Sequence, residues 1–221
     1  MDTAKEAFTR WMETGEPDKH LQGIDLPDVP LWAAWAIQRY SHDTDVLTAR
    51  ERYGELVAQL IDFIIDGKHP NLQVDDNGLV RTDGTRQPMS WMDSARPDGT
   101  PLIPRTGYLV EFNALWYNAL MFLLQMYADD KQMQSRVERW QKISDAYAES
   151  FAPTFLNDYG YLYDYVNGSY TDLSVRPNMV IAVGVDHTPL DRRQRKRILD
   201  FITRELLTPK GPVSYTHLTL P

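Results

Sequence analysis

Apolar residues recur every three or four positions along most of the chain. This spacing predicts short helices over residues 3–13 and about 177–185 and longer helices over about 30–41, 45–66, 109–129, 131–152 and 189–207. Pro30 lies near the start of one helix and Gly67 at the end of the next, which are positions that these residues favour. The helix over 109–129 is apolar on most sides, so we expect it to be buried.

The predicted helices form pairs that start near residues 30, 109 and 177. In each pair an apolar helix is followed by an amphipathic one, which is typical of α-hairpins in an inner and an outer layer. No alternating pattern indicates a sheet, and no repeat of 20–50 residues indicates a short-period solenoid. We therefore expect an all-α fold, an incomplete (α/α)6 toroid, because a closed ring needs more hairpins than these.

Two polar segments separate the pairs, at about 67–106 and 157–174. The first is rich in Gly, Pro, Asp and Asn and allows only short strands, for example over 79–81. A segment of this length without helices is usually functional in a compact domain. It contains the peptide Ser90-Trp91-Met92-Asp93. In a toroid such segments gather at one end, where they build the pocket.

Composition excludes several classes of function. The 221 residues carry a net charge of −8, which argues against a nucleic acid or an anionic membrane as partner. The absence of cysteine excludes disulfides, thiol nucleophiles and Cys-ligated metals, and the five histidines lack metal-binding spacing. The basic run over 192–197 is interpreted as the solvated face of a helix. With no apolar run of about 18 residues and no signal peptide, we expect a cytoplasmic protein.

Aromatic residues make up 11% of the chain. Their flat faces match the C–H faces of sugars, and neighbouring acids bind hydroxyl groups, so aromatics beside acids are typical of carbohydrate sites. Burial in a core is the commoner explanation of aromatic residues. Composition alone therefore does not establish a sugar site.

Two segments carry a more specific signal. Ser90-Trp91-Met92-Asp93 and the ungapped block over 103–120, IPRTGYLVEFNALWYNAL, resemble the amylo-α-1,6-glucosidase domain of glycogen debranching enzymes. Further similar segments follow the family's order: 28–32, 160–164, 175–178 and 206–211. Met179 departs from the family, which has Gln there. The resemblance covers about 25–212 and implies a six-hairpin glycosidase without a cofactor.

The resemblance also implies the substrate and the extent of the domain. Such an enzyme hydrolyses the α-1,6-linked glucosyl stubs of glycogen or limit dextrin with inversion. Residues 1–212 are expected to be a partial glucosidase domain, truncated at both ends, and 213–221 a non-native tail. Because the family's general base belongs to a later part of the domain, we expect this chain to lack it and to be inactive by itself.

Asp93 matches the family's general acid. Inversion needs an acid that protonates the glycosidic oxygen and a carboxylate that activates water, about 6.5–9.5 Å apart. The aromatic neighbour Trp91 and partial burial would raise the pKa of Asp93 as the reaction requires. Without the resemblance, a turn residue or a helix cap is the favoured explanation of Asp93, as it is for most aspartates in loops.

The expected substrate-binding residues are Trp32, Trp91, Arg105, Glu111, Trp116, Tyr117, Asp164, Arg176 and Asn178. The rings would stack on a glucosyl unit, although Trp116 and Tyr117 are adjacent on a helix and only one of them should face the pocket. Several polar residues have alternative explanations as ion pairs or helix-end charges. Glu111 would then pair with Arg105, and Arg176 with Asp164 or Glu111. Asp28 either caps the helix that starts near 30 or contributes to a subsite.

Two other functions remain open. The first is another six-hairpin glycosidase, similar to a glucoamylase or a trehalase, and hydrolysis of limit dextrin but not of maltose would argue against it. The second is a non-catalytic polysaccharide-binding fragment. Binding without turnover, unchanged by Asp93→Asn, would support the second.

Overall fold

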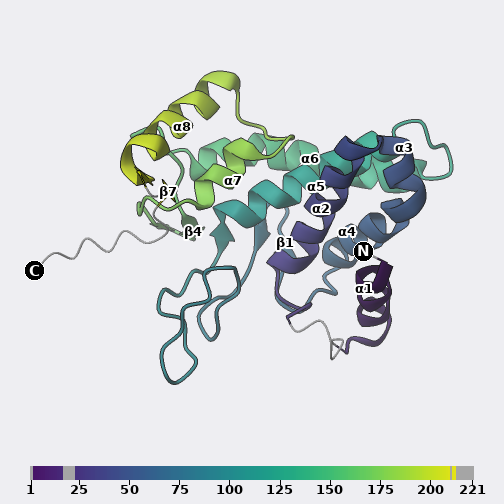
Figure 1. The fold of residues 1–221 in the computed structure, drawn as a ribbon, viewed down its shortest axis with the longest axis horizontal. Helices are drawn as coiled ribbons and strands as arrows, with labels where there is room; N and C mark the ends of the chain where they lie inside the picture. Colours follow the sequence, from purple (N-terminus) through teal and green to yellow (C-terminus); the bar gives the residue numbers. More distant parts are fainter. Residues whose placement is uncertain (1, 17–22, 210, 213–221) are drawn as a thin grey trace, which may run out of the picture.

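The computed structural model describes residues 2–16, 23–209 and 211–212, and this part of the chain is mainly helical (Figure 1). The helices are α1 (Asp2–Thr14), α2 (Asp28–Asp43), α3 (Val46–Ala49), α4 (Glu55–Ile65), α5 (Val110–Tyr127), α6 (Gln134–Phe155), α7 (Asn178–Gly184) and α8 (Arg192–Leu206). The predicted helices are confirmed with ends shifted by a few residues, except that the one over 45–66 is divided. In this described part, none is long and apolar enough to cross a bilayer. The tail at 213–221 lies outside the described residues.

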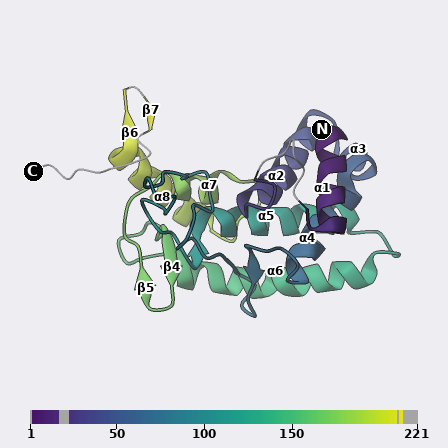
Figure 2. The ribbon, with the colours of Figure 1, turned by 90° about the horizontal axis from the view of Figure 1, so that it is seen from below.

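Helix α5 is the centre of the arrangement. It packs against α2 and α7, and its other side packs along the long helix α6 (Figures 1 and 2). Most of its apolar residues are completely or almost completely buried, as the pattern predicted, including Phe112, Leu115, Leu120 and Leu123. The helices α2 and α4, α5 and α6, and α7 and α8 follow one another as pairs. Of these pairs, α5 with α6 and α7 with α8 also pack against each other as α-hairpins do, whereas α2 packs on α3 and α5.

The expected single helix over 45–66 is divided. Residues Arg50–Gly54 form a π-helical turn between α3 and α4. Tyr127 of α5 contacts both ends of this turn: the Arg50 guanidinium lies 4.7 Å from its ring centre, and a Cβ on Gly54 would come within 2.7 Å of its hydroxyl oxygen. These contacts with a distant helix are not encoded in the local spacing of apolar residues. The end at Gly67 is confirmed, with a left-handed φ of 67°.

Short antiparallel strands correct the expectation of a purely helical fold. They are β1 (Gln73–Val74) with β2 (Val80–Arg81), β3 (Tyr108–Leu109) with β4 (Tyr165–Asn167) and β5 (Tyr170–Thr171), and β6 (Leu207–Thr208) with β7 (Gly211–Pro212). Strands of two or three residues are too short to show alternation, so only the pairing near 79–81 was predictable. The sheet of β3, β4 and β5 joins the start of α5 to the second polar segment, with Tyr108 opposite Val166.

Candidate functional site

The site begins in a loop between β2 and β3, over residues 83–107, which we call the Trp91 loop. It extends away from the helices (Figure 1). A backbone pairing of Thr82 with Gly107 closes its base, and a second pairing, of Ala95 with Pro101, forms a small hairpin near its tip. Gly84 packs so closely on the opposite limb that a Cβ there would lie 1.9 Å from the carbonyl oxygen of Arg105. The backbone of the loop is thus held in place before any side chain contributes.

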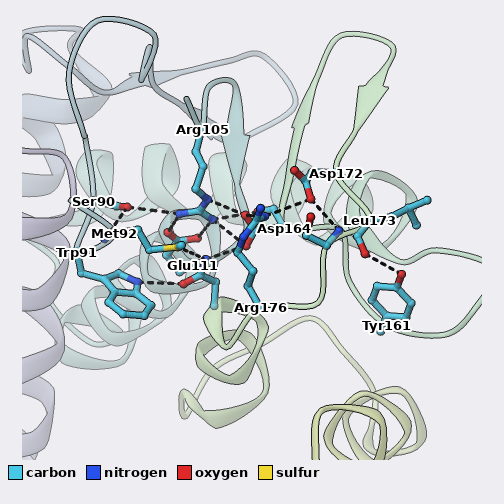
Figure 3. A network of polar contacts seen from close by, with 12 residues as sticks. Ser90, Trp91, Met92, Arg105, Glu111, Tyr161, Asp164, Asp172, Leu173 and Arg176 are labelled. Atoms are coloured by element: carbon cyan, nitrogen blue, oxygen red, sulfur yellow. Dashed lines mark hydrogen bonds and ion pairs between the residues drawn. The ribbon is translucent and has the colours of Figure 1, made fainter. Parts of the chain in front are cut away.

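Arg105, at the end of this loop, is 4% exposed and binds two carboxylates. Its Nη1 and Nη2 atoms donate to the two carboxylate oxygens of Glu111. Its Nε donates to Oδ2 of Asp164 at 2.7 Å and its Nη2 to Oδ1 at 3.1 Å (Figure 3). Nη1 also lies 3.4 Å from the hydroxyl of Ser90. The guanidinium thereby fixes the loop to the first turn of α5.

A second arginine and an asparagine complete the arrangement around Asp164. Nη1 of Arg176 donates to Asp164 at 2.7 Å and to Asp172 at 3.2 Å. Nδ2 of Asn178, the first residue of α7, donates to Oδ1 of Asp164 at 2.7 Å, and its Oδ1 accepts from the indole Nε1 of Trp91 at 3.0 Å. We call the set the Arg105 network; its members are Ser90, Trp91, Arg105, Glu111, Asp164, Asp172, Arg176 and Asn178.

Backbone hydrogen bonds bring the carboxylates of the network together. The N–H of Val110 donates to the carbonyl oxygen of Asp164, which places that residue beside the first turn of α5. The N–H of Asp164 in turn donates to the carbonyl oxygen of Asp172. Because these contacts follow from the pairing of β3, β4 and β5, the small sheet is what positions Asp164 between the two arginines.

The buried charges of the network compensate one another. Burial raises the pKa of Glu111, and the paired charge of Arg105 opposes that effect. Burial alone would lower the pKa of Arg105, but the charges of Glu111 and Asp164 outweigh it and raise the pKa above its ordinary range. A buried charge without a partner is costly, so each of these side chains needs the others. Of the alternatives that the sequence left open, ion pairing is the one that the structure shows for Glu111 and Arg176.

Asp28 lies next to this network. It is the first residue of α2, and Pro27 occupies the position before it, so the expectation that Asp28 caps the helix is wrong. Burial, with the charge of Glu111 adding to it, raises the pKa of Asp28 to about 6, although backbone N–H groups of Asp28, Val29 and Trp91 lower it. Asp28 lies beside the backbone of Trp91 and holds its proton more tightly than an ordinary aspartate does.

The predicted ring-stacking residues divide into two groups. Trp91 is 43% exposed, and Trp32 is partly exposed one helical turn after Asp28. Trp116 is completely buried and donates its Nε1 to the carbonyl oxygen of Gly78, so no face is free for a sugar. Tyr117 stacks on Tyr147 of α6, with ring centres 4.7 Å apart. Neither Trp116 nor Tyr117 faces the Arg105 network. Both lie on the side of α5 that packs toward α6 and toward the first polar segment, which contains Gly78.

Asp93 follows the network residue Trp91 by two positions and is exposed to solvent. The expectation that it is partly buried is wrong in this structure, because the part of the Trp91 loop that carries it, beyond Trp91, extends away from the helices. Its neighbour Met92 does contact the network, since the Met92 sulfur lies 3.2 Å from Nδ2 of Asn178. Asp93 thus directly follows a residue that contacts the network, while its own side chain is exposed.

Sequence reasoning missed Ser90, Met92 and Asp172. Asp172 lies four residues before Arg176 and pairs with it. This spacing indicates an ion pair only if the segment is compact, which the sequence did not lead us to expect. Ser90 and Met92 flank Trp91 in the most distinctive peptide of the chain, so their inclusion follows from position alone. The residues that the sequence did identify, Trp91, Arg105, Glu111, Asp164, Arg176 and Asn178, all meet in one cluster (Figure 3).

Comparison with known proteins gives one match. A family model described as amylo-alpha-1,6-glucosidase matches residues 22–215, a range that includes Asp28, Asp93 and every member of the Arg105 network. No curated protein matches the chain.

Proposed function

The chain belongs to the amylo-α-1,6-glucosidase family, and on that premise we propose that the enzyme of which it forms a part hydrolyses the α-1,6-linked glucosyl stubs of limit dextrin, with inversion and without a cofactor, and that this chain by itself, which would lack the general base, is inactive. Glycogen or its limit dextrin is then the partner, the cytoplasm the location, and no nucleic acid or membrane takes part. The hairpins around α5 would be part of an (α/α)6 toroid, with the Trp91 loop at its open end.

The convergence of motif residues supports this proposal most directly. Residues from the Trp91 loop, from the first turn of α5, from the second polar segment and from α7 meet at Asp164. Five charged side chains buried at one point are expensive to assemble, and a packed hydrophobic contact would often be more stable. Such an arrangement is best explained by what it holds in place, which is the indole of Trp91 and the carboxyl group that follows it.

In the proposed reaction the arginines and carboxylates position groups, and the exposed residues contact substrate. Trp91 and Trp32 would stack on glucosyl units, and Asp93 would donate its proton to the glycosidic oxygen. A glucan lying on Trp91 would also cover Asp93 and exclude water from the reacting groups. Glu111 and Asp164 are fully engaged by arginines and buried, so we do not assign the general base to either.

Release of glucose from limit dextrin tests the proposal. We expect release by the whole protein but none from maltose, and we expect Asp93→Asn to lower the rate at least about a hundredfold, since it removes the transferable proton. Asp98→Asn is the matched control, because Asp98 is an exposed carboxylate in the same loop. An unchanged rate for Asp93→Asn would exclude Asp93 as the acid. Release from maltose would favour a glucoamylase-like activity.

The exposure of Asp93 also favours a second candidate, a glucan-binding protein without turnover. In that case Trp91 and Trp32 would still stack on glucosyl units, and the Arg105 network would only support them. Calorimetric titration with limit dextrin separates the two functions: binding without glucose release, with the same affinity in Asp93→Asn, would establish the second candidate.

A further inference from the structure

A groove of about 810 Å³ lies between α8 and the turn that follows α6. This volume is within the range of about 300–1,000 Å³ found for small-ligand sites. The residues that matter here are Asn157, Tyr159, Gly160, Arg193, Arg197 and Arg204, and we call their site the α8 groove. In Figure 1 α8 is at the upper left and the Trp91 loop at the bottom, so the groove is separate from the candidate active site.

Tyr159 offers a ring to a ligand in this groove. It is 68% exposed, and its ring stacks at 6.2 Å on Tyr161, which stacks at 4.3 Å on Phe201 of α8. Tyr161 is fixed further by donating its hydroxyl to the carbonyl oxygen of Leu173 at 2.9 Å (Figure 3). The ring of Tyr159 is thus supported by a rigid stack while much of it remains open to solvent. Flat apolar rings of this kind match the C–H faces of sugars.

Asn157 supplies a donor that the fold does not use. The side chain is 6% exposed, and its Oδ1 accepts from the backbone N–H of Tyr161 at 3.3 Å. Its Nδ2 has no hydrogen-bond partner within the described part of the protein. Buried polar groups are nearly always satisfied in native structures, so an orphaned amide beside a groove indicates a missing acceptor.

Arg197 lies against the same turn. Gly160 adopts a φ of 85°, and a Cβ there would come within 2.0 Å of Nε of Arg197, so the absence of a side chain is what admits the guanidinium. Nη2 of Arg197 donates to the carbonyl oxygen of Tyr159 at 3.3 Å. The ring of Tyr159, the unused amide of Asn157 and the guanidinium of Arg197, which has spare donors, therefore lie together. They meet where residues 157–161 pack against one face of α8.

We propose that the α8 groove is a second binding site for an α-glucan chain, an inference that rests on the proposed function. The basic run that the sequence analysis assigned to solvent contributes Arg193 and Arg197 to it. Lys196 is paired with Asp200 and Arg204 with Glu205, so Arg193 and Arg197 are the remaining cations of the groove. The exposed ring of Tyr159 and the unused amide of Asn157, rather than charge, favour a neutral polyhydroxyl ligand over a polyanion. A second site would hold a branched polysaccharide while its stubs reach the Trp91 loop.

Titration of the whole protein with maltoheptaose tests the groove. We expect Tyr159→Ala and Arg197→Ala each to weaken binding about tenfold in a protein that already carries Trp91→Ala, which removes the more exposed of the two stacking residues of the other site. Tyr170→Ala is the control, since Tyr170 is also an exposed tyrosine but lies outside the groove, and it should leave the affinity unchanged.

The outcomes distinguish this inference from the proposed function. If Trp91→Ala alone abolishes binding, and Tyr159→Ala and Arg197→Ala bind as the unchanged protein does, the groove is not a glucan site and the proposed function stands. Binding of dextran sulfate but not of maltoheptaose at the groove would also overturn the inference. If glucose release from limit dextrin is absent while the groove variants lose maltoheptaose binding, the inference stands and the proposed hydrolysis fails.

Discussion

Arg105 joins two carboxylates that are far apart in the sequence, and all three side chains are buried. Removing the guanidinium would leave the buried Glu111 carboxylate without its cationic partner, while Asp164 would keep only Arg176 and Asn178. We therefore expect Arg105→Ala to lower the free energy of unfolding by about 3–5 kcal/mol, measured by urea denaturation. Arg81→Ala removes a half-exposed pair with Asp75 and should cost no more than about 1 kcal/mol. Equal losses in the two variants would show that the Arg105 pairs contribute no more than surface pairs.

Asp28 should make stability depend on pH. Its folded-state pKa of about 6 exceeds the ordinary 3.8, so the folded protein binds the proton more tightly than the unfolded chain does, and this contribution to stability is lost as pH rises through 6. Asn does not ionise. We expect the free energy of unfolding of Asp28→Asn, relative to the unchanged protein, to rise between pH 4 and pH 7 by up to about 3 kcal/mol. If the difference in the free energy of unfolding between the two proteins stays constant across this range, the pKa of Asp28 is not raised by burial.

The types of residue in the site could be predicted from the sequence, but not all of their roles. Glu111 and Arg105 were identified as either substrate ligands or ion-pair partners, and only burial decides between these roles. The enclosure of Trp116 and the exposure of Asp93 were likewise not predictable. Both depend on which segments pack over a side chain, and the spacing of residues along one helix or loop does not contain that information.

The long helices could be predicted from the sequence, whereas the π turn and the short strands could not. Long helices such as α5 and α6 follow from the spacing of apolar residues over many positions. The π turn at Arg50–Gly54 and the two-residue strands do not, because they arise from contacts with distant segments. Gly67 was predicted correctly since a glycine after the last apolar residue is a local signal.

Gly107, at the base of the Trp91 loop, connects these elements to the site. Its φ is 89°, and a Cβ there would come within 2.3 Å of the carbonyl oxygen of Val166 in β4. We expect Gly107→Ala to lower the free energy of unfolding by at least about 2 kcal/mol, since strain and a backbone clash combine. Gly99→Ala has a similar φ of 83° but open space around the Cβ, so only strain of about 1 kcal/mol should remain. Thermal unfolding of both variants would check this, and equal losses would mean that the contact with β4 is not tight.

At the scale of the whole molecule, the helices around α5 determine where the two polar segments lie. The succession of helix pairs around α5 was predictable because each pair has an apolar and an amphipathic member. That the two polar segments would meet was expected from the fold class, and the sheet of β3, β4 and β5 is how they meet. The orientation of the Trp91 loop depends on long-range contacts, of which the hydrogen bond from Trp91 to Asn178 spans 87 positions in the sequence.

Trp91→Phe tests whether this bond holds the loop against the helices. Phenylalanine keeps a ring but cannot donate to Oδ1 of Asn178, so the middle of the loop loses its indole hydrogen bond to α7 and keeps only the contact of the Met92 sulfur with Asn178. We expect amide hydrogen exchange over residues 90–104 to become faster, while exchange in α4 and α6 stays unchanged and the free energy of unfolding falls by only about 1 kcal/mol. Trp35→Phe makes the same change at a half-buried site in α2 and should leave the loop protected. Unaltered exchange in Trp91→Phe would mean that the backbone pairings at Gly107 and Ala95 hold the loop without the indole.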